Sequence, residues 1–282
     1  MPLTFSQRME LRRCRWIQRA FASIAPEYAD YLAKSKAESA KQPTRTTVLN
    51  YLLGIAKRRS GSTQTAYLEI GVRRPAENFD HIEADTKVGV DPGVEAPSEI
   101  VDFRLTSDEF FEQLDRGAIA PQATRFDVVF LDGLHLAEQV DRDIRNALGV
   151  VKDHGFVVLH DCNPPTELHA REAFKFHVMN AFNCWTGTTW KAFLKWRSEP
   201  SIHSCCIDSD WGIGVLSRTM PLRQAQPHTN PFYEFDRMAV DRRSQLNLMS
   251  YPEFQGTIES LLDSPASDAR PRDTHVNSRA AP

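Results

Sequence analysis

The chain carries AYLEIGV at residues 66–72, FDVVFLDGLH at residues 126–135 and GFVVLHDCNPP at residues 155–165. Each segment contains a short, almost continuous run of Val, Ile, Leu and Phe, which is typical of parallel strands covered on both faces. Each run then ends in Gly, Asp, His or Asn. This pattern predicts a buried sheet whose polar groups gather at the ends of its strands.

Similar apolar runs cover residues 87–90, 203–207 and 212–216, and a weaker strand pattern lies near 101–105. Between the strands, residues 137–151 predict a helix, because apolar side chains recur there every three or four positions. Strands and helices that alternate along a chain indicate a doubly wound α/β fold. We therefore expect a mostly parallel sheet of about seven strands, with ligands bound at the carboxyl ends of the strands.

Residues outside this alternation divide the chain into further parts. We expect a helical cap at residues 1–60, a Rossmann-like cofactor-binding domain at 61–220, a C-terminal appendage at 221–262 and a disordered tail at 263–282. The tail holds Pro, Ser, Asp and Arg with almost no large apolar side chain, so it cannot bury enough surface to offset chain entropy.

The cap begins with a basic helix predicted for residues 6–24, and two further helices are predicted for 28–42 and 46–59. The first helix carries apolar residues near helical spacing together with several arginines. These arginines are Arg8, Arg12, Arg13, Arg15 and Arg19. One interpretation is a helix on a membrane surface. The other is a cap packed on the main domain with solvated arginines, which Pro2 and Glu10 favour.

Composition excludes several protein classes. Among the 282 residues, 41% are hydrophobic and 25% are charged, as in ordinary globular proteins. The formal net charge of -3 gives no global positive field for nucleic acid. The five cysteines form no CxxC pair and indicate reduced, cytoplasmic thiols. No stretch approaches the roughly 20 apolar residues of a membrane span, and no signal-peptide core is evident.

The first strand ends at Glu69 and Gly71, and the second ends at Asp91. Glycine permits a tight turn or a close backbone approach to a ligand, but the GxGxxG fingerprint of dinucleotide sites is absent. An acid about 20 residues beyond such a turn can accept both ribose hydroxyls. Asp91 alternatively only starts a turn. Ser107 and Asp108 begin a predicted helix, either as part of its cap or at the edge of a nucleobase pocket.

The fourth and fifth strands end in Asp132 and Asp161, which we expect to face one crevice. Two carboxylates with Asn163 offer oxygen ligands suited to Mg²⁺ or another divalent cation. His135 and His160 add nitrogen ligands, or a base that works near neutral pH.

Five segments in order, YLEIGV, KVGVDPG, TSDEFF, FDVVFLDGLH and GFVVLHDCNP, resemble class I S-adenosylmethionine-dependent methyltransferases. The chain is similar to the bacterial branch related to macrocin-type sugar O-methyltransferases and, more distantly, to catechol O-methyltransferase. The later WTGTTWKAFLKWR and DSDWGIGVL resemble the same branch, so the likeness covers about residues 60–218. It implies a Rossmann-like methyltransferase sheet with S-adenosyl-L-methionine as its cofactor.

The resemblance also implies roles for single residues. It places Glu69 and Gly71 against the methionine part of the cofactor, Asp91 at the ribose, and Ser107 with Asp108 near the adenine. Asp132 matches an acid that lies beside the cofactor and binds metal in catechol O-methyltransferase.

In the same comparison, Asp161 matches the second metal acid, and His135 falls where that enzyme carries its lysine base. Cys162 stands where the third metal ligand, an Asn, would be, and Asn163 follows one residue later. The implied metal ligands are therefore Asp132, Asp161 and Asn163.

These observations predict methyl transfer to a hydroxyl of a small molecule or glycan. The acceptor must lose a proton, and the candidate catalytic residues are His135, Asp132 and His160, with or without a divalent metal. The alternatives are a NAD-dependent oxidoreductase, which the missing glycines disfavour, and a catalytically inactive cofactor-binding scaffold. We expect no nucleic-acid partner, and the extra helices at both ends suit a homodimer.

Overall fold

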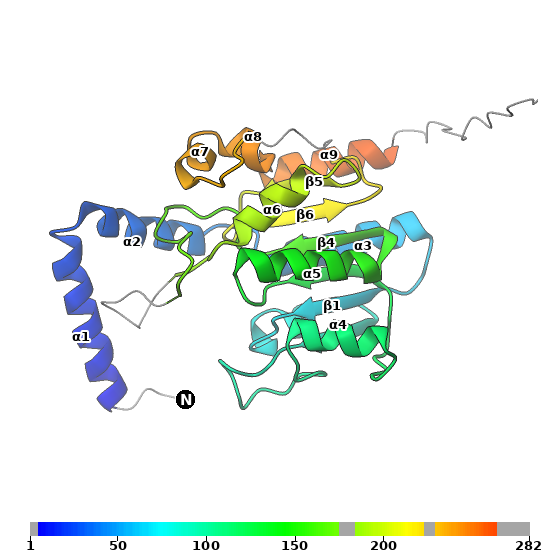
Figure 1. Ribbon diagram of the computed structural model, residues 1–282, viewed down its shortest axis with the longest axis horizontal. Coiled ribbons are helices and arrows are strands. Elements are labelled where there is room, and N and C mark those ends of the chain that lie inside the picture. Colours follow the sequence, from blue (N-terminus) through cyan, green and yellow to red (C-terminus); the bar gives the residue numbers. More distant parts are fainter. Residues whose placement is uncertain (1–4, 175–183, 223–228, 264–282) are drawn as a thin grey trace, which may run out of the picture.

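The computed structural model describes residues 5–174, 184–222 and 229–263, and a seven-stranded sheet between two helical layers forms its centre (Figure 1). Beyond Asp263, the predicted tail lies outside the described residues. The strands are β1 (Ala66–Ile70), β2 (Thr86–Val90), β3 (Phe126–Leu131), β4 (Val151–Leu159), β5 (His203–Ile207), β6 (Ile213–Ser217) and β7 (Leu248–Met249). The predicted doubly wound, mostly parallel α/β sheet of about seven strands is confirmed. No helix in these described ranges is long and apolar enough to cross a membrane.

The strands lie in the order β2-β1-β3-β4-β6-β5-β7. Neighbouring strands are parallel except that β6 runs antiparallel to both β4 and β5. The chain continues from β1 to β2 on one side, and β3 then pairs with the other side of β1. This reversal of strand order creates a switch point at the carboxyl ends of β1 and β3, where open α/β sheets bind ligands.

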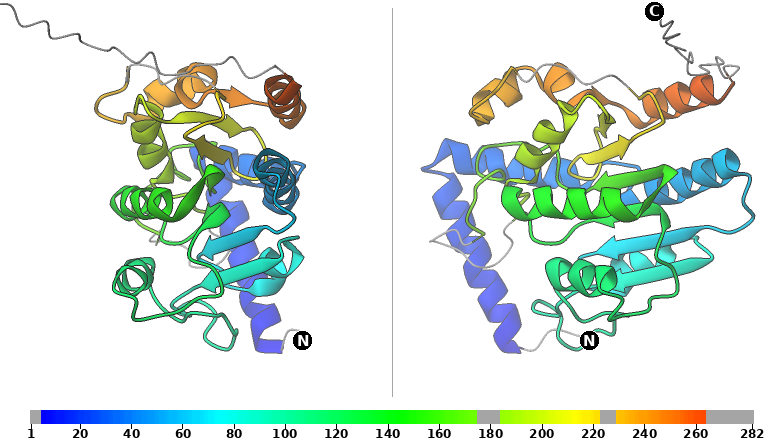
Figure 2. Two further views of the ribbon diagram at one scale, coloured as in Figure 1. Left: turned by 90° about the vertical axis from the view of Figure 1, so that its right-hand side faces the viewer. Right: turned by 45° about the vertical axis from the view of Figure 1, so that its right-hand side comes forward.

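Helices cover both faces of the sheet, as the near-continuous apolar strands require. Helices α4 (Ser107–Asp115), α5 (Ala137–Val150) and α6 (Thr189–Arg197) lie on one face, and α3 (Arg45–Ser60) and α9 (Tyr251–Asp263) lie on the other (Figure 2). Because side chains alternate along a strand, each strand feeds two separate cores.

Strand β3 shows this division clearly. Its Val129 and Leu131 pack with α4, α5 and α6, whereas Val128 and Phe130 pack with α3 and α9. All four side chains are buried. The helix predicted at 137–151 is α5, and it ends where β4 begins, so the chain turns directly from helix to strand.

The remaining helices flank this sandwich. They are α1 (Phe5–Ala22), α2 (Pro26–Ser39), α7 (Phe235–Val240) and α8 (Arg242–Leu246). The three helices predicted in residues 6–59 are confirmed, although only α3 enters the core of the sheet. Helix α1 instead packs on α2 at the margin of the molecule (Figure 1).

Two parts of the sheet differ from the sequence prediction. The prediction of a strand at 101–105 is wrong, because in this segment only Phe103 forms an isolated bridge, with Val90. The Asp102 carboxylate accepts the Gly89 N–H at 2.7 Å and so interrupts regular pairing. Conversely, β7 extends the sheet from within the predicted appendage, where its two residues are too few to show a strand pattern.

Asp127 joins β1, β3 and β4 at the ends of these strands that lie away from the switch point. Its side chain is fully buried and accepts hydrogen bonds from Ala66 N at 2.7 Å, Lys152 Nζ at 2.8 Å and His154 Nε2 at 2.9 Å. Burial raises the pKa of this carboxyl, but the contacts with Lys152, Ala66 and His154 outweigh it and lower the pKa. Asp127 therefore stabilises the fold as an anion.

We expect Asp127→Ala to lower the free energy of unfolding by about 3–5 kcal/mol, because it leaves the buried Ala66 N–H and the partly buried Lys152 and His154 side chains without their acceptor. Denaturant unfolding near neutral pH measures this loss, and exposed Asp153→Ala on the adjoining strand is the control. The lowered pKa means that the Asp127 contribution is present above about pH 3.9 and disappears as pH falls through the native pKa. Equal stability of the two variants would contradict the assigned role.

Candidate functional site

The carboxyl ends of β1, β3 and β4 meet at the switch point. Leu131 pairs with Ile70 on one side and with Leu159 on the other. Beyond these pairs, Asp132 N donates to Ile70 O at 2.9 Å, and His160 N donates to Leu131 O at 3.1 Å. The residues that follow the strands therefore lie side by side.

Gly71 forms the turn after β1 and fits closely against the end of β3. Its φ is +91°, a conformation that L side chains rarely adopt. A Cβ at this position would collide with the carbonyl oxygen of Asp132 and the Cα of Gly133. Because residue 71 has no side chain, the end of β1 can lie directly beside Asp132 at the end of β3.

Asp132, Asp161 and two histidines form a cluster at this point. His135 Nε2 lies 3.3 Å from Asp132 Oδ1, and His135 Nδ1 lies 3.0 Å from Asp161 Oδ2. His160 Nδ1 lies 3.3 Å from Asp132 Oδ1 and 3.4 Å from Asp161 Oδ1. Each histidine therefore contacts both carboxylates.

Two further residues complete the cluster. Asp210, in the turn between β5 and β6, places Oδ1 3.3 Å from His160 Nε2. Arg45, the first residue of α3, places Nη1 3.4 Å from Asp210 and Nε 3.9 Å from Asp132. We call these six residues the strand-end cluster: Arg45, Asp132, His135, His160, Asp161 and Asp210.

Mutual contact sets the charge of the strand-end cluster. Burial lowers the pKa of His135, but Asp161 and Asp132 outweigh it and raise the pKa to about 10. The pKa of His160 is raised in the same way, well above its ordinary value. Burial raises the pKa of Asp161, but the two histidines lower it to about 2, and the pKa of Asp132 is lowered well below its usual range. At neutral pH the cluster therefore holds three carboxylates against three cations.

Sequence reasoning missed Arg45 as a site residue. Positively charged side chains are unfavourable at a helix N-terminus, because the helix dipole is positive there. An arginine at the first position of α3 was therefore the available signal that acids lie nearby. Asp210, which precedes β6, is predicted from sequence to lie in a turn from which it could reach an acceptor, and its φ of 43° agrees with the turn.

The loop after β4 explains where Asp161 and Asn163 point. Asp161 has a φ of 60°, and Asn163 N donates to Trp211 O at 3.0 Å in the β5–β6 turn. The Asn163 amide accepts from Arg242 at 2.6 Å and donates to Asp208 at 3.1 Å. Cys162 is fully buried in the core. The structure thus brings Asp161 into the strand-end cluster, while Asn163 and Cys162 face away from it.

A divalent cation fits part of this cluster. One ligand atom each from Asp132, His135 and Asp161 can be chosen so that all lie within 4.8 Å of one another. His135 Nδ1 lies near Asp161 but is buried without an aligned hydrogen bond, so it can serve as a ligand once a metal displaces its proton. Two carboxylate oxygens with one imidazole nitrogen form a donor set that several divalent metals accept.

Asp91 and Glu69 lie at neighbouring strand ends. Asp91 accepts Arg73 N at 2.8 Å on one carboxylate oxygen and Gly93 N at 2.6 Å on the other. Glu69 is buried and accepts from Tyr67 Oη at 2.7 Å and from Asn78 Nδ2 at 2.9 Å. Burial, with a further contribution from Asp132, raises the pKa of Glu69 to about 7 despite these hydrogen bonds.

Ser107 and Asp108 lie on the first turn of α4, apart from the strand-end cluster. Gln139 on α5 donates to Ser107 Oγ at 3.0 Å and to Asp108 Oδ1 at 3.1 Å. The helix cap itself is Thr106, which forms a reciprocal capping box with Glu109. Capping therefore does not need the side chains of Ser107 and Asp108.

An aromatic side chain forms a wall beside the strand-end cluster. The Trp185 ring stacks on His135 with 5.3 Å between centroids and 21° between planes. Thr188 holds the same segment in place, because its N–H donates to His135 O and its Oγ1 accepts from Ala137 N, both at 2.8 Å. Two other tryptophans of this region lie elsewhere: Trp190 is buried in the core, and Trp196 packs against that core.

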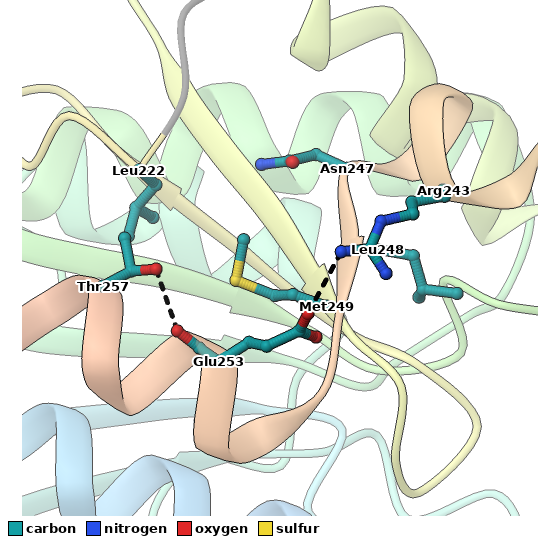
Figure 3. Close-up of a pocket in the computed structure, with 7 residues that line it drawn as sticks. All are labelled: Leu222, Arg243, Asn247, Leu248, Met249, Glu253 and Thr257. Carbon is teal, nitrogen blue, oxygen red and sulfur yellow. Dashed lines mark hydrogen bonds and ion pairs between the residues drawn. The ribbon is translucent and has the colours of Figure 1, made fainter.

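A separate cavity of about 360 Å³ lies between β7 and α9 (Figure 3). Its polar lining includes Arg243 and Glu253, whose charged groups pair at 3.0 Å. None of its lining residues belongs to the strand-end cluster. It offers no connected group of reactive side chains, so we do not assign the chemistry to it.

Residues 53–162 match a family model described as a methyltransferase domain. That range begins in α3 and ends just after Asp161, so it includes every member of the strand-end cluster except Arg45 and Asp210. No curated protein matches the chain.

Several solved structures resemble the fold. An O-methyltransferase from Bacillus cereus in complex with SAH is 10% identical, with a TM-score of 0.41, over 71% of this chain and 96% of that one. The O-methyltransferase TomG from Streptomyces achromogenes, in complex with SAM, is 13% identical, with a TM-score of 0.40, over 74% and 98%. The methyltransferase MycE, with Mg, SAH and mycinamycin VI, is 14% identical, with a TM-score of 0.37, over 63% and 50%.

We expect Gly71→Ala to lower the free energy of unfolding by at least about 2 kcal/mol, because the new Cβ adds strain at positive φ and collides with the end of β3. Chemical denaturation measures the loss. Gly54→Ala within α3 is the matched control, because a Cβ there meets no atom within 4 Å, and it should be neutral or stabilising. An equally stable Gly71→Ala protein would contradict the close approach of the two strand ends.

Proposed function

We propose that the protein transfers a methyl group from S-adenosylmethionine to a hydroxyl of a small molecule or glycan. The match of residues 53–162 to a family model described as a methyltransferase domain supports this proposal. The observation that carries the proposal is the strand-end cluster. It places carboxylates and histidines beside the Gly71 turn and the end of β1, where a cofactor binds in open α/β sheets.

The cofactor lies across the ends of β1 and β2 in this proposal. Its methionine part occupies the turn at Gly71, near Glu69, and its ribose hydroxyls donate to Asp91. The Asp91 carboxylate has about four acceptor positions, and the two loop N–H groups occupy only two of them. Ser107 and Asp108 lie further along the sheet edge and contact the adenine.

Methyl transfer is an in-line displacement. The acceptor oxygen bonds to the methyl carbon, the carbon–sulfur bond breaks, and its electron pair stays on sulfur, which becomes a neutral thioether. The acceptor also loses its hydroxyl proton, so the site must supply a base or stabilise the alkoxide. Such reactions depend chiefly on positioning, because no covalent enzyme intermediate is needed.

The strand-end cluster supplies the proton-handling groups. Asp132 and Asp161 hold negative charge close to where an acceptor hydroxyl would lie, and they orient His135 and His160 through direct contacts. In the metal-free site we assign proton removal to His135, with Asp132 and His160 in support; where a metal occupies His135, the base is His160. The raised pKa of His135 means that it acts as a base only after its proton has left the ion pairs, for which the loaded site must weaken the field of the carboxylates.

Asp132, Asp161 and His135 are the residues that would hold a divalent metal. A bound metal would lower the pKa of the acceptor hydroxyl as a Lewis acid. Asn163 is left out of this revised ligand set, because Arg242 and Asp208 occupy both ends of its amide. The Trp185 ring offers an apolar face that suits a phenol or a sugar ring.

The first prediction of this proposal concerns the cofactor. We expect titration calorimetry with S-adenosylhomocysteine to show micromolar binding and titration with NAD to show none. Asp91→Ala should weaken binding at least about tenfold, because the ribose loses a charge-assisted hydrogen-bond partner. Asp115→Ala, at the exposed end of α4, is the control and should bind like the wild type. Binding of NAD instead would overturn the cofactor assignment.

The second prediction concerns turnover. In a panel of catechols and sugar alcohols, S-adenosylhomocysteine release should fall at least about 100-fold in His135→Gln and Asp161→Asn, while affinity for S-adenosylhomocysteine changes little. Exposed His81→Gln is the matched control. Unchanged turnover in both cluster variants would remove their catalytic roles. EDTA should lower the rate, and added Mg²⁺ should restore it. A rate that neither EDTA nor Mg²⁺ changes would exclude the metal-assisted mechanism and retain the metal-free one.

A further inference from the structure

Helix α1 has two faces with different surroundings. One face packs on α2, where Ile17 and Phe21 join a small cluster and the Phe21 and Tyr28 rings meet edge to face at 5.2 Å. Trp16 lies one residue before Ile17, which turns it by about 100° around the helix axis. Its side chain is 71% exposed, and that of Met9, about two turns earlier, is 50% exposed.

Arginines flank these exposed apolar side chains. Arg12 and Arg19 follow Met9 and Trp16 by three residues each, and Arg13 lies on the opposite side of the stripe. Residues at such spacings share one face of a helix. All three arginines are exposed. We call Met9, Arg12, Arg13, Trp16 and Arg19 the Arg-Trp face.

Charge is distributed unevenly between α1 and the rest of the chain. The helix contains five arginines and a single acid, Glu10, although the whole protein has a formal net charge of -3. Positive charge is therefore concentrated on a helix that lies at the margin of the molecule (Figures 1 and 2). Its length of 18 residues corresponds to about 27 Å, long enough for several contacts with an extended surface.

We propose that the Arg-Trp face binds the surface of an anionic lipid bilayer. Tryptophan prefers the boundary between headgroups and acyl chains, and arginines beside it attract acidic headgroups. An exposed apolar stripe bordered by arginines is the pattern of helices that lie in the plane of a membrane surface. The packing of Ile17 and Phe21 on α2 keeps another side of the helix attached to the protein, so the exposed Arg-Trp face points outward.

This proposal favours lipid over a second copy of the chain for a physical reason. The Arg-Trp face has few large apolar side chains, which is little surface for a stable protein interface, whereas bilayer association gains from each arginine near acidic headgroups. The proposal is independent of methyl transfer, because no member of the strand-end cluster lies on α1.

Flotation of the full-length chain with vesicles tests the proposal. We expect co-flotation with vesicles of equal parts phosphatidylcholine and phosphatidylserine, and none with phosphatidylcholine alone. Arg12→Glu combined with Arg19→Glu should reduce the bound fraction at least about tenfold, and Trp16→Ser should also reduce it. Raising the salt from about 0.1 M to about 1 M should weaken binding, because the Debye length falls from about 10 Å to about 3 Å.

The matched control variant reverses the charge of two exposed arginines outside α1, Arg116→Glu with Arg237→Glu. This variant should float with anionic vesicles like the wild type. Circular dichroism confirms that each variant is folded. Absence of flotation with anionic vesicles overturns the proposal, as does equal flotation of the Arg12/Arg19 and control variants. A dimer in light scattering that Trp16→Ser dissociates, without vesicle binding, would assign the face to a second copy instead.

Discussion

Three largely buried carboxylates lie close together, Asp132 and Asp161 after strands β3 and β4 and Asp210 in the β5–β6 turn, and the rest of the site depends on how their charge is balanced. A buried charge without a partner costs several kcal/mol, so Asp132, Asp161 and Asp210 require compensating cations. His135 and His160 supply two, and Arg45 supplies the third. Because Arg45 begins α3, the packing of that helix on the sheet and the charge balance of the site support each other.

This balance also shapes the proposed chemistry. The sulfonium of S-adenosylmethionine is positive and becomes neutral when its methyl group leaves, while the acceptor hydroxyl releases a proton. The overall charge near the carboxylates is therefore conserved if that proton stays in the strand-end cluster. A site already holding protonated histidines can accept it only after one of them has lost its proton, so binding of ligands and adjustment of charge are expected to be coupled.

Sequence could predict the strands and the residues at their ends, because burial on both faces and an abrupt polar ending are local signals. The sequence could not predict in which direction the Asn163 side chain points. The left-handed conformation of Asp161 and the hydrogen bond from Asn163 N to the Trp211 carbonyl decide it. Arg45 lies far from the other cluster residues in sequence and reaches them only through helix packing. Tertiary contacts of this kind leave no periodic pattern in a single chain.

A chain of contacts also joins the outer helix to the site. Helix α2 holds the segment after β4, because Ser35 Oγ lies 2.8 Å from His169 Nε2 and Tyr31 donates to Cys184 O at 2.7 Å. Within that segment, Thr166 Oγ1 lies 2.8 Å from the other ring nitrogen of His169. Cys184 adjoins Trp185, whose ring covers His135. Since α1 packs on the same helix, a membrane surface that orients α1 would also orient Trp185, which the proposed function places beside the acceptor. A membrane-bound state would thus present the strand-end cluster in a fixed direction relative to the lipid, which favours acceptors that approach from that side.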